Sequence, residues 1–205
     1  GAFGGNVFEG GHSLWGYENF MTQILLNRPL VEYSLDKLVE NHLANLKLYL
    51  EAVGDYIQII QMGDDLGMQE GPLLSPKLYR EVIKPRQARI YQYVKENSNL
   101  YVFLHSCGSI VEFIPDLIDI GVDILNPVQI SARGMDPRYL KREFGKHLTF
   151  WGGGCSTQTT LTHGSVEDVV REVEEMIGIF APGGGYVFTQ VHSIQAGIPP
   201  EKILA

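Results

Sequence analysis

Short apolar runs alternate with longer amphipathic stretches along most of the chain. The apolar runs predict strands at residues 56–62, 100–105, 122–125, 148–152 and 186–191, and residues 6–8 are expected to close an earlier strand. Between these runs the apolar positions recur at helical spacing. A strand, a helix and another strand joined by short connections predict parallel strands with crossover helices.

Capping residues mark the ends of the first predicted helices. Ser34 is expected to cap a helix that ends at Val53, just before a glycine. Ser75 and Pro76 form an N-cap and first-turn pair for the next helix. Pro85 should kink or divide that helix, because proline removes a backbone donor and clashes with the preceding turn.

Two later helices have equally clear boundaries. Asp136, followed by proline, opens a helix that Gly145 ends, and Ser165 begins a capping-box-like start for a helix reaching Phe180. The glycine-rich residues 181–185 then lead into the last strand. This order, helix before strand, is the reverse of a phosphate-binding loop, so these glycines are expected to end a helix.

Residues capable of chemistry follow five of the predicted strands, at positions 64–65 (DD), 105–107 (HSC), 126–127 (NP), 152–155 (GGGC) and 191–193 (VHS). Functional residues after several different strands are typical of the carboxyl-end face of a (β/α)8 barrel. Such a barrel usually needs about 250 residues. The 205 residues are therefore expected to be one domain, the later portion of a barrel from about strand 3 to strand 8.

His105 and Cys107 are the first candidate metal ligands. Residues two apart on an extended strand point to the same side, and imidazole and thiolate are the ligands that zinc prefers. One such pair also fits a small buried cysteine. The second cysteine, Cys155, follows another strand, and a histidine with two cysteines is a known catalytic zinc set with an open fourth position. The sequence therefore predicts zinc held by His105, Cys107 and Cys155.

Four further polar residues are weighed as site residues. Asp64 is expected to lie in a solvated turn or to cap the next helix, whereas Asp65 is predicted to face the pocket as an acid/base or orienting group. Glu70 is a weaker candidate for a further ligand. His192 either hydrogen-bonds the substrate as a catalytic residue or satisfies loop carbonyls, and both readings stay open.

The composition narrows the class of protein. The formal net charge is −8 and the basic residues form no block, which argues against nucleic-acid partners. No apolar run approaches the roughly 20 residues that span a bilayer, and the first residues do not resemble a signal peptide. Two cysteines form no disulfide framework, so a cytoplasmic setting with free thiols is expected.

Five segments together resemble the uroporphyrinogen decarboxylase superfamily: GDDLGMQEGPLLSPKLYREVIKP at 63–85, LHSCGSI at 104–110, VDILNPVQ at 122–129, GGGCSTQ at 152–158 and APGGGYVFTQVHSIQAGIPPEKILA at 181–205. Their order and spacing match along nearly the whole chain. The resemblance implies a single (β/α)8 barrel with its cleft at the carboxyl ends of the strands. It also implies that N-terminal βα units are missing from this sequence.

The superfamily has two chemistries, and the residues favour one of them. Its decarboxylases convert uroporphyrinogen III to coproporphyrinogen III without a metal, whereas its zinc-dependent methyltransferases carry His-x-Cys and a later Cys. His105, Cys107 and Cys155 are similar to that set in type and order, although Cys155 comes one strand earlier than in the family pattern. The Gly-His-Gly of true decarboxylases is replaced here by Val191, His192 and Ser193.

The resemblance therefore implies a zinc-dependent methyltransferase that moves a methyl group between a corrinoid (cobalamin) protein and a small thiol, methoxyl or methylamine-type substrate. The corrinoid protein and this small molecule are the expected partners. The alternatives are a uroporphyrinogen decarboxylase, and an inactive barrel fragment or corrinoid-protein-binding module.

Overall fold

The computed structural model describes residues 1–204, which form two compact units interleaved along the chain. The first unit contains Gly1–Leu66, Leu74–His105 and Pro115–Asp123. The second contains Gly67–Leu73, Ser106–Ile114 and the chain from Ile124 onward. A single domain over residues 1–205 stays a prediction.

Three parallel strands form the centre of the first unit. They are β1 (Ala2–Gly4), β2 (Ile59–Gly63) and β3 (Tyr101–His105), with β2 paired to β1 and to β3. Val102, Phe103 and Leu104 are successive residues of β3 and all are buried. A strand that is apolar on both sides is expected in a parallel sheet whose two faces are covered.

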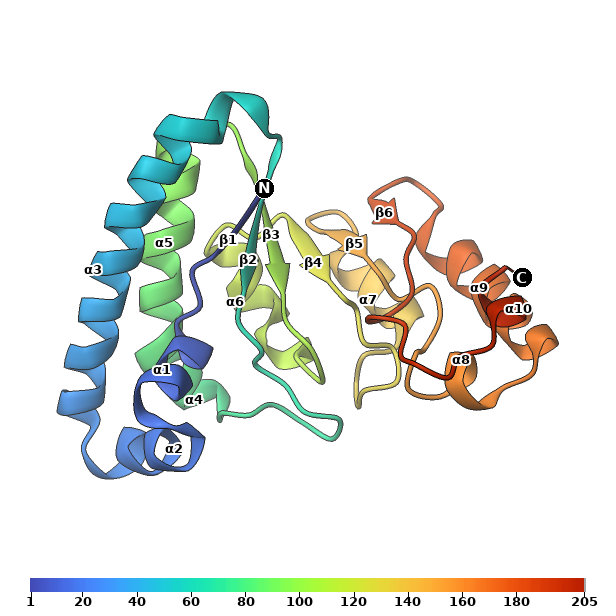
Figure 1. The fold of residues 1–205 in the computed structure, drawn as a ribbon, viewed down its shortest axis with the longest axis horizontal. Coiled ribbons are helices and arrows are strands. Elements are labelled where there is room, and N and C mark those ends of the chain that lie inside the picture. The colour runs from blue at the N-terminus through green and yellow to red at the C-terminus, as the bar shows by residue number, and fades with distance from the viewer. Residues whose placement is uncertain (205) are drawn as a thin grey trace. The chain divides into compact units, whose positions relative to one another are not determined.

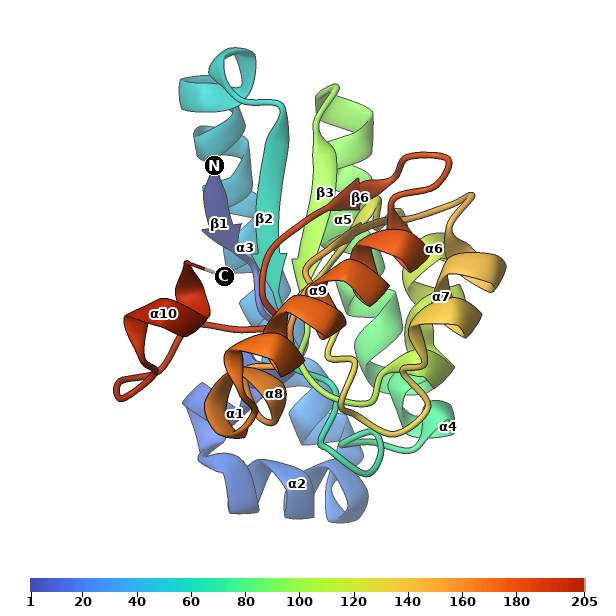
Figure 2. The ribbon, with the colours of Figure 1, turned by 90° about the vertical axis from the view of Figure 1, so that its right-hand side faces the viewer.

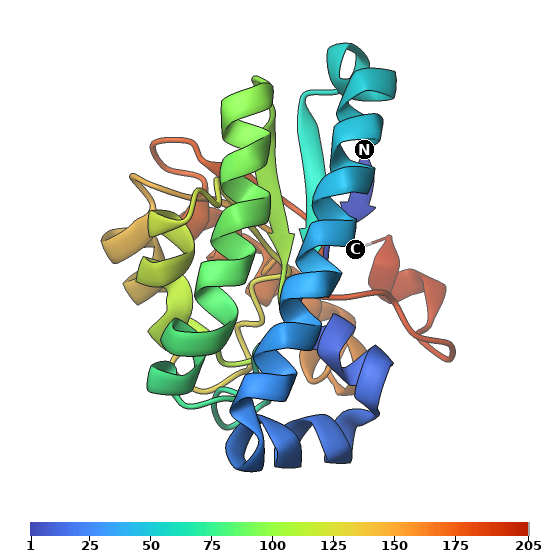
Figure 3. The same cartoon turned by 90° about the vertical axis from the view of Figure 1, so that its left-hand side faces the viewer.

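The first unit contains long helices and short helical turns beside this sheet. They are α1 (Phe8–Trp15), α2 (Tyr17–Leu26), α3 (Arg28–Val53), the short turn η1 (Gly54–Tyr56), α4 (Pro76–Leu78), the π-helical turn η2 (Tyr79–Ile83), α5 (Lys84–Asn97) and α6 (Ile114–Asp119), whose first residue belongs to the second unit. Figure 1 shows α3 and α5 running side by side, and Figure 3 shows the same pair in front of β2 and β3.

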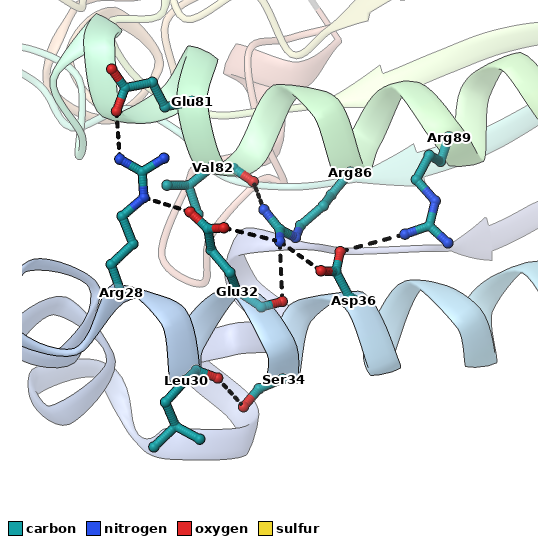
Figure 4. Close-up of polar contacts among 9 residues, drawn as sticks. All are labelled: Arg28, Leu30, Glu32, Ser34, Asp36, Glu81, Val82, Arg86 and Arg89. Atoms are coloured by element: carbon teal, nitrogen blue, oxygen red, sulfur yellow. Dashed lines mark hydrogen bonds and ion pairs between the residues drawn. The ribbon is translucent and has the colours of Figure 1, made fainter.

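A buried ionic contact joins α3 to α5. Arg86 of α5 is buried and donates from Nη2 to Asp36 Oδ2 (2.9 Å) and to the Glu32 carbonyl (3.1 Å), and from Nη1 to the Val82 carbonyl (2.7 Å). Figure 4 shows this guanidinium between the two helices, with Arg89 on the other side of Asp36 from Arg86. Both helices therefore contribute groups to one charged cluster.

The second unit also has three parallel strands. They are β4 (Ile124–Asn126), β5 (Thr149–Trp151) and β6 (Tyr186–Val187), with β5 paired to β4 and to β6. Its helices are η3 (Val111–Phe113), α7 (Pro137–Phe144), α8 (Thr160–His163), α9 (Val166–Phe180) and α10 (Pro200–Ile203). Figure 2 shows α9 with α7 beside it.

Most of the predicted boundaries are confirmed. Ser75 Oγ accepts from the Leu78 amide, and α5 begins at Lys84, directly before the proline that was expected to divide the helix. Asp136 caps α7, and Ser165 forms a capping box at the start of α9. The last strand is shorter than predicted, because only Tyr186–Val187 pair with β5.

Two predictions near the N-terminus are wrong. Residues 6–8 do not end a strand, because β1 closes at Gly4 and α1 already begins at Phe8. Ser34 does not cap α3, which starts at Arg28, and its hydroxyl donates to the Leu30 carbonyl inside the helix instead. None of the helices in the described part of the chain is both long and apolar enough to cross a membrane.

Candidate functional site

The loop after β3 carries Cys107 and is held by close backbone packing. Gly108 has a φ of +83°, and a Cβ at this position would lie 2.3 Å from the carbonyl carbon of Gly67. The Ser109 amide donates to the Met68 carbonyl at 2.8 Å. Glycine at 108 therefore lets the two loop segments touch directly.

Gln129, a buried glutamine that follows β4 in the chain, holds the same loop in place. The Gly108 amide donates to Gln129 Oε1 at 2.9 Å. Gln129 Nε2 in turn donates to Gln69 Oε1 (2.8 Å) and to Gln158 Oε1 (3.0 Å). Both ends of the buried carboxamide are thus hydrogen-bonded, so the backbone beside Cys107 has a defined position.

Two potential metal ligands of the second unit meet at this loop. Cys107 and His192 each offer one ligand atom, and these atoms lie within 4.8 Å of each other. His105 ends β3 in the first unit, two residues before Cys107, so their spacing is set by the short chain between them. Cys107 and His192 both belong to the second unit and are brought together by its fold.

The donor types of this group fit zinc. Imidazole nitrogen and thiolate sulfur bind zinc at about 2.0–2.3 Å, so two ligand atoms on one tetrahedral ion lie roughly 3.3–3.8 Å apart. Atoms within 4.8 Å need only small side-chain adjustments to reach that separation. Cys107 is partly buried and His192 is exposed, so one side of the group is open to solvent.

Cys155, the third ligand predicted from the sequence, does not belong to this group. It is buried in an apolar cluster with Leu161 and Val169. Burial, followed by the neighbouring Glu172 carboxyl, raises the pKa of the Cys155 thiol to about 12. Because metals bind the thiolate, this environment does not prepare Cys155 as a ligand. Its role as a ligand stays a prediction.

Asp64 is neither solvated nor the cap of the helix that follows it, so that expectation is wrong. It is fully buried, and its carboxylate accepts from the backbone amides of Val7 (3.0 Å), Phe8 (2.9 Å) and Glu9 (2.8 Å) at the start of α1. Gln87 Nε2 donates to it as well, at 2.9 Å. Burial raises the pKa of Asp64 to about 6 despite these four donors.

Asp65 lines a cavity of about 300 Å³ at the carboxyl ends of β1, β2 and β3. Its Oδ1 lies 3.9 Å from Nε2 of His105, which lines the same cavity. Asn6 and Glu9 also contribute to the wall. Glu70 is exposed and is not in the potential metal-ligand group of the described residues.

Three residues near the candidate site were not predicted from the sequence: Asn6, Glu9 and Gln129. Asn6 and Glu9 follow β1 in the chain, so their signal was present, but it was hidden because residues 6–8 were read as strand. Gln129 lies three residues after β4, and nothing in its local sequence distinguishes it from an ordinary loop glutamine.

The fold of this chain is similar to that of a solved methyltransferase structure. A search of curated proteins finds no match. A solved structure of a methyltransferase from Methanosarcina mazei superposes with a TM-score of 0.71 at 22% sequence identity, covering 94% of this chain and 52% of that one. The chain thus spans about half the length of that structure, and the likeness extends to the fold.

The fold prediction is confirmed in its class. The six strands follow one another in the order β1 to β6, are parallel where they pair within each unit, and alternate with helices, as in part of a (β/α)8 barrel. The family profile of uroporphyrinogen decarboxylase (URO-D) matches residues 5–205. The chain therefore belongs to the uroporphyrinogen decarboxylase family.

Proposed function

We propose that this protein is a zinc-dependent methyltransferase that moves a methyl group between a corrinoid protein and a small substrate, in a cytoplasmic setting. The observation that carries the proposal is the closeness of Cys107 and His192, whose ligand atoms lie within 4.8 Å of each other, with His105 only two residues before Cys107 in the chain. These three residues would hold the zinc ion. When bound, zinc supplies Lewis-acid chemistry and lowers the pKa of a thiol or hydroxyl that it contacts.

The surrounding residues have separate tasks in this proposal. Asp65, 3.9 Å from His105 Nε2, orients the imidazole and serves as a nearby proton acceptor. Gln129 holds the Gly108 amide and so fixes the direction in which Cys107 presents its sulfur. The exposed side of His192 leaves an approach for a partner protein.

The URO-D family also contains decarboxylases, which is the alternative that the family match keeps open. Decarboxylation in this family needs no metal, so it gives no reason for a thiol two residues after a histidine and near a second histidine. The methyltransferase from Methanosarcina mazei has the same fold, which is compatible with methyl transfer but does not by itself assign it.

The first experiment is zinc content per chain after dialysis against a weak chelator. The wild type is compared with Cys107→Ser, His192→Ala and Cys155→Ser. Near-stoichiometric zinc that is lost in the first two variants and kept in the third supports the proposed ligands. Zinc lost with Cys155→Ser and kept with His192→Ala would restore the ligand set predicted from the sequence. A folded chain without zinc would refute the metal site.

The second experiment measures the reaction. Loss of the methyl group from methylcobalamin, followed by its absorbance with and without a small thiol, tests transfer in one direction. Uroporphyrinogen III is offered in parallel. Metal-independent formation of coproporphyrinogen III would assign the decarboxylase function instead.

A further inference from the structure

Helix α2 is apolar on two sides, and only one of them is covered by the protein. Phe20 and Ile24 are buried where α2 packs against α1 and α3 (Figure 1). Tyr17, Met21 and Leu25 recur at four-residue spacing, so they form a second stripe along the same helix. Tyr17 is 52% exposed and Leu25 is 71% exposed. Because a helix that is apolar over most of its circumference is normally buried, the exposed stripe indicates a binding partner.

The exposed stripe lines an open hollow of about 500 Å³. The lining, called the α2 patch from here on, consists of Tyr17, Glu18, Met21, Thr22, Leu25 and Leu26. Leu26, the last residue of the helix, is 77% exposed. Glu18 is the one charged residue in this described lining. The α2 patch is therefore a mainly apolar surface into which side chains of a partner can insert.

We propose that the α2 patch is the interface between two copies of this chain. The copies are related by a twofold axis that passes near Met21 and Thr22, and their α2 helices lie antiparallel. Tyr17 of each copy then lies beside Leu25 of the other. The α2 patch belongs to the first unit alone, and the dimer does not depend on the proposed function.

The size of the apolar surface fits a dimer of modest affinity. Leu14 and Leu30 stand just beyond the two ends of α2 and are 60% and 45% exposed. With side-chain areas on the order of 150–250 Å², these two residues and the exposed residues of the α2 patch present roughly 500 Å² of apolar surface. The polar atoms around them bring this face close to the roughly 800 Å² per partner of a standard interface.

The distribution of charge favours a second copy over an unlike partner. Homodimer interfaces are more apolar than interfaces with transient partners, and charged residues are depleted at their centre. The single charge of the α2 patch, Glu18, lies in the first turn of the helix. An antiparallel pair keeps the two Glu18 carboxylates at opposite ends of the interface. Each carboxylate then lies toward the carboxyl end of the other α2, which the partly exposed Arg28 follows in the chain.

A lipid surface matches the same face less well. Helices that lie on a membrane usually carry lysine or arginine beside their apolar side, because membrane surfaces are commonly anionic. The α2 patch carries a carboxylate instead, and the formal net charge of the chain is −8. Repulsion would therefore oppose the approach of an anionic membrane to this face.

The first test is the mass of the particle in solution, measured by sedimentation equilibrium over a range of concentrations. The wild type should pass from one copy to two, with a dissociation constant on the order of micromolar. Leu25→Glu places a carboxylate in the α2 patch and should weaken the dimer at least about tenfold, because the interface would bury an unpaired charge. Leu48→Glu is the matched control, at an exposed leucine of α3 outside the patch, and should change the dissociation constant less than about twofold.

A crosslink then locates the axis. Met21→Cys and Thr22→Cys each bring two thiols, one from either copy, close to the proposed axis. Oxidation in air with copper phenanthroline should link the copies, since the Cβ atoms of a disulfide lie about 3.5–4.5 Å apart. Leu48→Cys is the control for random collisions. The wild type shows whether Cys107 or Cys155 forms links by itself.

Three outcomes would overturn the inference. They are a folded wild type that stays monomeric at every concentration, a dimer that Leu25→Glu and Leu48→Glu weaken equally, and crosslinking of Leu48→Cys as fast as that of Met21→Cys and Thr22→Cys. Binding of anionic vesicles by a monomeric wild type, lost in Leu25→Glu, would assign the face to a lipid surface instead. Circular dichroism of each variant separates a lost interface from a lost fold, and the crosslinks decide if Leu25→Glu does not fold.

Discussion

Removing the Asp64 carboxylate is expected to destabilise the protein far more than removing an ordinary helix cap. Asp64→Ala takes away the acceptor of four hydrogen bonds, from three amides at the start of α1 and from Gln87, at a fully buried position. A lost cap costs about 1 kcal/mol, and each donor left buried without a partner costs about 1–3 kcal/mol. Allowing for water entering the space, we expect a loss of about 3–5 kcal/mol.

Asp136→Ala is the matched control. Asp136 also caps a helix with its carboxylate, but it is exposed and accepts a single amide bond, from Tyr139 at 2.7 Å. Its loss should cost about 1 kcal/mol. Urea unfolding followed by circular dichroism gives both values. If Asp64→Ala costs no more than Asp136→Ala, the reasoning fails. It also fails if the amides of residues 7–9 keep their hydrogen-exchange protection in Asp64→Ala.

The same carboxyl gives stability a particular pH dependence. Burial raises the pKa of Asp64 to about 6, above the roughly 3.9 of an exposed aspartate, so the folded state holds a proton that the unfolded state has released. Its contribution is fully present below about pH 4 and is lost as the pH rises through about 6. Relative to Asp64→Asn, the wild type should lose up to about 3 kcal/mol between pH 4 and 7. Parallel curves for the two proteins would contradict the shift.

Three further predictions use other parts of the structure. Arg86→Met should cost about 2–4 kcal/mol in urea unfolding, because Asp36 and the carbonyls of Glu32 and Val82 lose their buried donor. Arg89→Met, at a half-exposed pair, should cost under about 1 kcal/mol, and similar costs for the two variants would refute the difference. Cys155 should react with a thiol reagent at pH 8 much more slowly than Cys107, because burial raises the pKa of the Cys155 thiol to about 12. The variants Cys107→Ser and Cys155→Ser each leave one thiol to measure, and equal reaction rates in the two would contradict this prediction. Gln129→Leu should speed thiol labelling of Cys107 and weaken zinc retention several-fold. Gln129→Glu keeps an acceptor for the Gly108 amide, so it should restore part of the slow labelling and part of the zinc retention. No change in Gln129→Leu would show that the loop does not need the carboxamide.

The sequence predicted the regular elements well where their signals are local. The capping residues Ser75, Asp136 and Ser165 begin helices as expected, because a cap depends on atoms within a few positions. Helices α1 and α2 were missed, because α1 contains two glycines, which disfavour a helix, and the two helices pack against each other. Gly11, for example, contacts Phe20 so closely that a Cβ would lie 2.3 Å from the ring.

In the candidate site, too, local contacts could be predicted from the sequence and long-range contacts could not. The proximity of His105 and Cys107 follows from their spacing on an extended chain, and the sequence predicted it. The approach of His192 to Cys107 depends on the path of a loop more than eighty residues later, which no local pattern encodes. Asp64 depends on a long-range contact as well. Its local sequence suggested a turn, but its carboxylate accepts from the Phe8 amide at the start of α1, more than fifty residues earlier.

The interleaving of the two units limits how this protein can be truncated or recombined. The backbone passes from one unit to the other after Leu66, Leu73, His105, Ile114 and Asp123. Neither unit is a continuous stretch of sequence, so neither can be cut out, expressed alone or exchanged as a cassette. A protease nick anywhere between Gly67 and Asp123 would divide both units between two fragments. No single crossover between homologues preserves both units, because one before Gly67 divides the first unit and one beyond Asp123 divides the second.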